Sequence, residues 1–227
     1  MKILVIADVH GNLSSLHSLS EQSFFKEADI KICLGDMIVD YSRPNECIEY
    51  LTQNFICLLG NNDSYIASGI PARGLNSFKQ RKINQITMMS SIVSGDNKEI
   101  IKNLAKSYTL EIEGIKFHFC HYFWDQDDDC IVDGGSKCLS GRQALFKGID
   151  ADYIIFGHEH EFNHFYDEKK HYVCCATLGL RNPSRCLVIE VEEGNVKVEE
   201  KKFLHDFDIE NNLECKLVKM NENFFIK

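Results

Sequence analysis

Three apolar runs near the N-terminus each stop at a polar or glycine-led loop, and this feature constrains the fold more than any other. The runs are Lys2–Ala7, Ile30–Leu34 and Phe55–Leu59, and the loops begin with Asp8, Gly35-Asp36 and Gly60-Asn61-Asn62-Asp63. Continuous aliphatic runs of this length are typical of strands buried on both faces of a parallel sheet. Helices are predicted between them, after the capping residue Asn12 and over Pro44–Leu51, where proline lies in the first turn. The alternation of strand, polar loop and helix predicts an α/β core with parallel strands.

The remainder of the chain changes in character twice. Residues 64–106 contain helical stretches near Leu75–Val93 and Lys98–Lys106, and are predicted to form a helical insertion that acts as a lid. The following segment is rich in strand patterns, with a hairpin turn at Glu113-Gly114 and a short helix over Ser140–Lys147. Strands are predicted at Thr109–Ile112, Ile115–Phe119, Tyr153–Phe156, His164–Tyr166, Tyr172–Ala176, Cys186–Glu192 and Val196–Glu199. The last four of these are expected to complete a second sheet, within one domain spanning residues 1–208 that is followed by a tail at 209–227.

The balance of charge argues against some classes of partner. The 227 residues include 25 Lys and Arg against 34 Asp and Glu, a net charge of −9, which disfavours binding to nucleic-acid backbones and anionic membranes. A small anionic substrate is still compatible if a metal supplies positive charge. No segment approaches the ~20 apolar residues of a membrane span, and the opening apolar run is too short for a signal peptide.

The cysteines do not follow the pattern of a disulfide framework. Six of the ten lie inside apolar runs, where a thiol behaves as a small hydrophobic side chain. These are Cys33, Cys57, Cys120, Cys174, Cys175 and Cys186. The chain has no Cys-x-x-Cys pair that would indicate a zinc ribbon or a redox site. We therefore expect reduced cysteines and a cytoplasmic location.

Polar side chains of metal-binding type follow the ends of several predicted strands. In open α/β sheets, this edge is where ligands bind. The residues are Asp8, His10, Asp36, Asn61, His121, His158 and His160. Such a mixture of oxygen and nitrogen ligands suits a pair of Mn²⁺, Fe or Zn²⁺ ions.

Five short blocks, taken in order, resemble the calcineurin-like metallophosphoesterases. The blocks are Asp8-Val9-His10-Gly11-Asn12, Gly35-Asp36, Gly60-Asn61-Asn62-Asp63, His121 and Gly157-His158-Glu159-His160. The resemblance extends from Met1 to about Asp208 and is strongest to a small prokaryotic branch that opens with Asp-Ile/Val-His-Gly-Asn. It implies a four-layer α-β-β-α sandwich of two mixed sheets, with the helical insertion at the rim of the cleft.

The resemblance also implies a site for two divalent metal ions. Asp8, His10 and His160 would hold one ion, Asn61, His121 and His158 would hold the other, and Asp36 would bridge them. Mn²⁺ is the first expectation, with Fe, Zn²⁺ and Ni²⁺ as alternatives. Two ions ~3.5–4 Å apart lower the pKa of a bridging water, so that a hydroxide can attack the phosphoryl group in line. Asp36, Asn62 and Asp63 are the predicted catalytic residues, and Asp63 is expected to orient its neighbours.

Three positions depart from the family pattern. Many relatives have His where this chain has Asn62, and that His is thought to protonate the leaving group. An amide cannot act as a general acid, so esters with poor alkoxide leaving groups are expected to react slowly or to need another donor. Some prokaryotic relatives that carry Cys at this position resemble phosphodiesterases, which favours diesters or activated esters. Cys120-His121-Tyr122 stands where Thr-His-Gly is usual, and Cys175-Ala176-Thr177-Leu178 replaces the usual Asn-Pro-Gly-Ser.

The sequence therefore predicts a hydrolase that acts on a small phosphoric ester, with a mild preference for diesters. Within enzymes, the alternatives are a phosphomonoesterase or protein phosphatase, a nucleotide pyrophosphohydrolase and a nuclease. A non-catalytic metal-binding scaffold is the alternative from a different class. The sequence indicates no oligomeric state.

Several other side chains have two interpretations. Arg43 and Arg181 are predicted to contact the substrate phosphate through their forked guanidinium groups. The aromatic stretch Tyr122-Phe123-Trp124 could stack on a base or pack within a loop, and the acidic run at residues 125–129 could be solvated or hold a further cation. The remaining histidines, which match no motif, are expected to be solvated or in the core: His17, His118, His164, His171 and His205.

Overall fold

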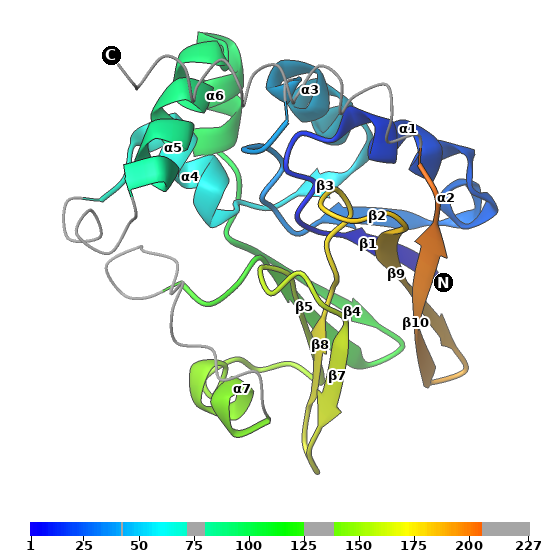
Figure 1. The fold of residues 1–227 in the computed structure, drawn as a ribbon. Helices are drawn as coiled ribbons and strands as arrows, with labels where there is room; N and C mark the ends of the chain where they lie inside the picture. The colour runs from blue at the N-terminus through cyan, green and yellow to red at the C-terminus, as the bar shows by residue number, and fades with distance from the viewer. Residues whose placement is uncertain (42, 72–79, 125–138, 206–227) are drawn as a thin grey trace.

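A computed structural model describes residues 1–41, 43–71, 80–124 and 139–205, which form two five-stranded sheets (Figure 1). The strand order is β10-β9-β1-β2-β3 in the first sheet and β4-β5-β6-β8-β7 in the second. The first sheet contains β1 (Lys2–Ile6), β2 (Ile30–Cys33), β3 (Ile56–Cys57), β9 (Ser184–Glu192) and β10 (Asn195–Phe203). The second contains β4 (Ser107–Ile112), β5 (Ile115–Cys120), β6 (Tyr153–Phe156), β7 (Asn163–Tyr166) and β8 (His171–Cys174).

The first sheet is mixed and has β1 at its centre. β1 pairs parallel with β2, and β2 pairs parallel with β3, as the repeated strand and helix units predict. On its other side β1 pairs antiparallel with β9, with Ile3 opposite Ile189. β10 then returns as a hairpin beside β9.

The prediction that Cys186–Glu192 and Val196–Glu199 complete the second sheet is therefore wrong. These segments form β9 and β10 of the first sheet. Consecutive residues such as Leu187, Val188 and Ile189 are buried, so β9 needs cover on both of its faces. A position next to β1 supplies that cover, but the sequence pattern indicates burial without indicating which strand is the partner.

The second sheet begins with the predicted hairpin. β4 and β5 are antiparallel, and Glu113 and Gly114 in their turn both have positive φ angles, of 52° and 79°. β5, β6 and β8 are parallel neighbours, and β7 is antiparallel to β8 at the edge.

Helices cover the outer faces of both sheets, which confirms the four-layer α-β-β-α sandwich (Figure 1). The helices are α1 (Leu13–Glu21), α2 (Ser23–Glu27), α3 (Pro44–Asn54), α4 (Asn61–Ser68), α5 (Gln80–Ile92), α6 (Gly95–Lys102) and α7 (Leu139–Leu145). Side chains of β1 alternate between two cores: Leu4 packs with the helices of the first layer, and Ile3 packs between the sheets. A third cluster around Phe146 and Phe156 lies at the outer face of the second sheet, next to α7.

Local expectations for the helices also hold. Asn12 caps α1, because its side chain accepts a hydrogen bond of 3.0 Å from the backbone N–H of Ser15. The segment 64–106 is helical, although its first helix, α4, already begins at Asn61. Whether this segment acts as a lid stays a prediction. The domain boundary at 208 and the tail at 209–227 lie outside the described residues.

The six cysteines expected in apolar surroundings all carry free thiols, and five of them are buried while Cys57 is half-buried. This agrees with their interpretation as small hydrophobic side chains. Within the described parts of the chain, no helix has the length and apolar character needed to cross a membrane.

Candidate metal centre

The seven residues predicted as metal ligands lie at the ends of five strands. Asp8 and His10 follow β1, Asp36 follows β2, Asn61 follows β3, His121 follows β5, and His158 and His160 follow β6. Parallel pairing within each sheet brings these ends to a common edge. The two sheets meet there directly, since the backbone N–H of His158 donates to Asp8 Oδ2 at 3.0 Å.

The backbone at this edge is in an uncommon conformation. The described part of the chain has seven non-glycine residues with positive φ, and five of them are candidate ligands. Their φ angles are 55° at Asp8, 57° at His10, 52° at Asp36, 69° at His158 and 61° at His160. Such a conformation costs about 1–3 kcal/mol per residue and persists where the surroundings impose it, often at functional sites.

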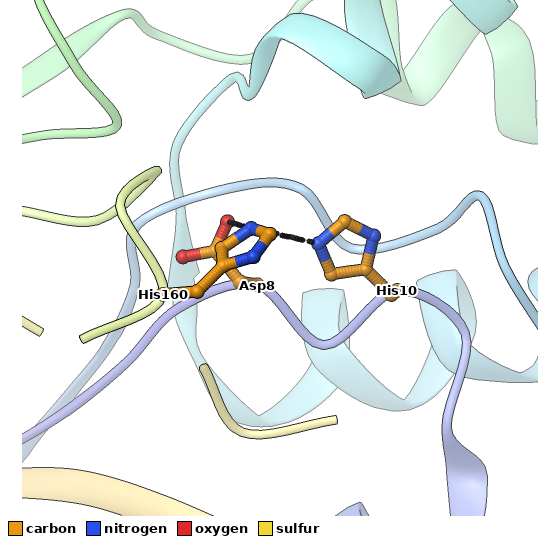
Figure 2. A group of neighbouring side chains, drawn as sticks. All are labelled: Asp8, His10 and His160. Carbon is orange, nitrogen blue, oxygen red and sulfur yellow. Dashed lines mark hydrogen bonds and ion pairs between the residues drawn. The ribbon is translucent and has the colours of Figure 1, made fainter. Parts of the chain in front are cut away.

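Asp8, His10 and His160 form the first group of ligand atoms. Nε2 of His160 lies 3.2 Å from Asp8 Oδ1 and 3.3 Å from Nε2 of His10, and His10 Nε2 lies 3.8 Å from the same carboxylate oxygen. Figure 2 shows the two rings and the carboxylate directed toward one another. Metal bonds of about 2.0–2.2 Å separate the ligand atoms around one ion by roughly 3.0–3.5 Å. The two distances from His160 Nε2 lie in this range, and the distance from His10 to Asp8 is slightly longer.

Two further observations fit a cation at the first group. Asp8 is fully buried, and its Oδ1 accepts no hydrogen bond of regular geometry from the described residues. Burial raises the pKa of Asp8, but the neighbouring His10 and His160 rings outweigh burial and hold this pKa well below its usual value. A buried carboxylate that stays ionised needs positive charge beside it, which a divalent ion supplies.

Asn61, His121, His158 and Asp36 form the second group. Asn61 Oδ1 lies 3.0 Å from Nε2 of His121 and 3.0 Å from Nδ1 of His158. Asp36 Oδ2 lies 3.6 Å from Nε2 of His121. Asp8, Asp36 and His121 also offer ligand atoms within 4.8 Å of one another, so the Asp8 carboxylate is close to both groups. The division of the ligands between two ions, and the bridging role of Asp36, stay predictions.

Asn62 and Asp63 hold the loop that carries Asp36. The backbone N–H of Asn62 donates to Asp36 Oδ1 at 2.8 Å, and its side-chain amide donates to Asp36 Oδ2. The buried Asp63 carboxylate accepts from the backbone N–H groups of Met37 (3.0 Å), Ile38 (3.3 Å) and Gly60 (3.2 Å). Burial and the nearby Asp36 charge raise the pKa of Asp63 to about 7, against these backbone donors. Both side chains therefore support Asp36, while their part in the reaction stays a prediction.

Gly60 is needed for the close approach between the loops after β2 and β3. A Cβ atom at Gly60 would collide with the backbone nitrogen and the Oδ1 of Asp36. A larger residue would displace the carboxylate, so the glycine is part of the site.

Asp40 is a site residue that the sequence analysis missed. Its Oδ2 lies 2.8 Å from Nδ1 of His10, on the far side of that ring from Asp8 and His160. Burial lowers the pKa of His10, but the neighbouring Asp40 and Asp8 carboxylates outweigh burial and raise the pKa to about 10. A carboxylate behind a ligating imidazole fixes the orientation and tautomer of the ring. Asp40 opens a block, residues 40–46, that resembles a segment of the same prokaryotic branch, but nothing in the local pattern links its carboxylate to His10.

Three side chains support the loop that carries His158 and His160: Tyr122, Glu159 and Arg142. The ring of Tyr122 stacks on His158, with centroids 4.8 Å apart, and its hydroxyl donates to Glu159 at 3.3 Å. Arg142 of α7 forms an ion pair with Glu159, which lies between His158 and His160 in the sequence. Tyr122 is thus a packing residue here, and Phe123 and Trp124 pack against the cluster at the outer face of the second sheet.

The other predicted residues lie apart from these groups or in other contacts. Arg181 is paired with Glu161, the residue after His160, at 2.5 Å, and Arg43 is half-buried at the start of α3. Their contact with substrate stays a prediction.

The histidines that match no motif lie outside the candidate metal centre. His17 is exposed and His205 is buried against Ser184, as solvated or core histidines would be. His164 and His171 hydrogen-bond to each other at 3.0 Å, His118 contacts Thr109, and residues 125–129 lie outside the described residues.

An α-β-β-α sandwich with Asp, Asn and His side chains gathered at its strand ends is typical of metal-dependent phosphoesterases. Residues 1–162 match the family described as calcineurin-like phosphoesterase, and this chain belongs to that family. The family uses divalent metals, and the described residues include two groups that could bind one.

Comparison with individual proteins gives relatives of similar length. The protein MJ0912 of Methanocaldococcus jannaschii, described as uncharacterized, is 24% identical over 185 residues, which cover 75% of this chain and 73% of that protein. The crystal structure of hypothetical protein PH1004 from Pyrococcus horikoshii OT3 has a TM-score of 0.79 at 15% identity, over 96% of this chain and 93% of that one. A metallophosphoesterase from Sphaerobacter thermophilus has a TM-score of 0.67 at 14% identity, over 96% and 94% of the two chains. These two structures share the fold with this chain.

Proposed function

We propose that this protein hydrolyses small phosphoric esters with two bound divalent ions, Mn²⁺ first among them, and that it prefers diesters. The observation that carries the proposal is the convergence of candidate ligand atoms from five strand ends, with five of the seven residues on backbone held in the left-handed region. Only a few per cent of non-glycine residues adopt that conformation, and such residues cluster at functional sites. The ligand atoms also meet within 3.0–3.8 Å in each group.

The chain's own residues would arrange the reaction. Bound divalent ions would activate a water molecule and polarise the phosphoryl oxygens. Asp36 would stay in place through its two hydrogen bonds from Asn62, and Asp63 would keep the loop of Asp36 rigid. Since the whole chain carries a net charge of −9, the attraction for an anionic ester would come from the site and not from the surface.

The preference for diesters rests on Asn62 in place of His, because some relatives that carry Cys at this position resemble phosphodiesterases. Asn62 also bears on the leaving group. Its side-chain amide donates to Asp36 and has no proton that it could release to a leaving group. A substrate with a good leaving group would therefore react faster than one that needs protonation. A phosphomonoesterase, a nucleotide pyrophosphohydrolase and a non-catalytic metal-binding scaffold are the competing functions.

The test is hydrolysis of bis-p-nitrophenyl phosphate and p-nitrophenyl phosphate by metal-depleted protein that has been refilled with Mn²⁺. The expected result is Mn²⁺-dependent cleavage with a diester rate above the monoester rate, lost in Asp36→Asn. His17→Gln serves as the matched control, because His17 is exposed on α1. Its activity should equal that of the wild type.

Other outcomes separate the competing functions. A monoester rate above the diester rate would contradict the diester preference and favour a phosphomonoesterase. Cleavage of nucleoside triphosphates alone would favour a pyrophosphohydrolase. Two bound ions with no hydrolysis of any ester would favour a scaffold that binds metal without catalysis.

A further inference from the structure

Helix α5 reaches the metal centre through a continuous chain of polar contacts. Gln85 of α5 donates through its side-chain amide to Asp40 Oδ1 at 2.6 Å and to the backbone oxygen of Val39 at 3.3 Å. The other carboxylate oxygen of Asp40 lies 2.8 Å from Nδ1 of His10. Each oxygen of Asp40 therefore has one of these two partners, and the chain runs from α5 to a candidate metal ligand.

The backbone around Asp40 is also fixed to His10. The backbone N–H groups of Asp40 and Tyr41 both donate to the carbonyl oxygen of His10 at 3.0 Å. His10 itself is in the left-handed region, with φ of 57°, and its side chain is almost fully buried. Because both the main chain and the ring of His10 contact residue 40, a displacement of Asp40 would move the ligand.

The ability of the His10 ring to bind an ion depends on which of its two nitrogens carries the proton. A proton on Nδ1 can be donated to Asp40, which leaves the lone pair of Nε2 available. Nε2 is the atom that faces Asp8 and His160 (Figure 2). Asp40 therefore selects the form of the ring that can bind an ion.

Helix α5 is anchored next to Gln85 by its apolar face. Ile86 and Met89 are 3% and 2% exposed and pack in the core beneath the first helix layer. At its far end the helix is held by Asn45 of α3, which donates to the backbone oxygen of Ile92 at 3.2 Å. Gln85 thus projects from a fixed helix. Its contact with Asp40 therefore depends on how α5 is docked.

We propose that Asp40 and Gln85 are positioning residues that couple the docking of α5 to metal binding by Asp8, His10 and His160. Coupling of this kind is reciprocal: docked α5 strengthens metal binding at this group, and bound metal stabilises the docking of α5. The inference rests on the metal-binding part of the proposed function and is independent of which ester is hydrolysed.

The test compares metal binding and helix dynamics in full-length variants. Asp40→Ala and Gln85→Met remove the two links, and Gln80→Met is the matched control, because Gln80 lies on the same helix and hydrogen-bonds only to Asn84 among the contacts described. Mn²⁺ binding is measured by isothermal titration calorimetry, and the exchange of backbone amides in α5 is measured with and without Mn²⁺. Circular dichroism establishes that each variant is folded.

The variants are expected to weaken Mn²⁺ binding to different extents. Asp40→Ala should weaken one class of Mn²⁺ site by about 10–100-fold and leave the other unchanged, as loss of a support behind a ligating histidine does. Gln85→Met should weaken the same class by several-fold and remove the Mn²⁺-induced slowing of exchange in α5. Gln80→Met should match the wild type in both measurements. If Asp40→Ala does not fold, Gln85→Met and Asp40→Asn decide the question.

Unchanged Mn²⁺ binding and unchanged exchange in Gln85→Met and Asp40→Asn would overturn the inference, as would a wild type that binds no divalent ion. Failure of the proposed function is distinguished from this outcome by hydrolysis. A wild type that binds Mn²⁺ with the expected coupling but cleaves no ester would refute the phosphoesterase and leave the coupling intact.

Discussion

Arg142 forms a buried ion pair with Glu159, which lies between the two histidines that follow β6. The side chain of Arg142 is fully buried and that of Glu159 is 5% exposed. The guanidinium also lies over the rings of Phe156 and Phe165, at 5.5 and 5.6 Å from their centroids. A helix that covers the second sheet is thereby linked to the loop of His158 and His160.

Breaking this pair from one side should be costly. Arg142→Met would leave the Glu159 carboxylate buried without its main counter-charge, and we expect a loss of about 3–5 kcal/mol in the free energy of unfolding. The double variant Arg142→Met/Glu159→Gln should recover part of that loss, because no charge is then left buried. Urea unfolding of the two single variants and the double variant gives the comparison. Additive losses would mean that the two charges do not stabilise each other.

The two histidines after β6 should serve different ions. His160→Gln removes a ligand of the group with Asp8 and His10, whereas His158→Gln removes a contact of Asn61. We expect each variant to retain one Mn²⁺ per chain where the wild type binds two, measured by elemental analysis after dialysis. His17→Gln should keep both ions. Loss of both ions in either variant would show that the groups are not independent.

Gly60 should tolerate no side chain. Gly60→Ala places a methyl group against Asp36, so we expect loss of metal binding together with a destabilisation of roughly 1–3 kcal/mol from overpacking. Gly95→Ala at the start of α6 is the control, because a Cβ there meets nothing within 4 Å. That change should be neutral or stabilise the protein by up to about 1 kcal/mol. Equal metal binding and stability in both variants would contradict the tight contact.

The stability of the metal-free protein should depend on pH through His10. The pKa of His10 is raised from 6.5 to about 10 in the folded state, despite burial, by Asp40 and Asp8. Protonated His10 therefore stabilises the fold fully below pH 6.5, and this stabilisation is lost as the pH rises toward 10. Thermal unfolding of metal-free protein between pH 6 and 10 measures the effect, with Asp40→Asn as the comparison. A variant that falls in stability as much as the wild type would exclude Asp40 as the cause.

Metal binding should release the same proton. Because His10 can bind an ion through Nε2 only when that atom is deprotonated, Mn²⁺ binding at pH 8 should liberate protons. Calorimetry in two buffers with different ionisation enthalpies would measure their number. Identical heats in both buffers would show that His10 is already neutral in the metal-free protein.

Much of the site could be predicted because it depends on local pattern. The apolar runs that end at Asp8, at Asp36 and at Asn61 identify strands of the first sheet, and the parallel pairing of those strands follows from the helices between them. Since parallel strands end at the same edge, the candidate ligands had to come together. The caps, the hairpin at Glu113 and the helix over Pro44–Asn54 are local in the same way.

The sequence by itself thus determined the class of fold, the strand ends and the chemical types of the candidate ligands. Only the tertiary structure placed β9 beside β1, paired Arg142 with Glu159, and set Asp40 between His10 and Gln85, which are separated from Asp40 by 30 and 45 residues. These relationships join side chains from elements that are distant in the chain, and no local periodicity encodes which of many charged or amide groups will meet. Packing of the helices on the sheets decides them, because burial forces each polar group to find a partner within reach.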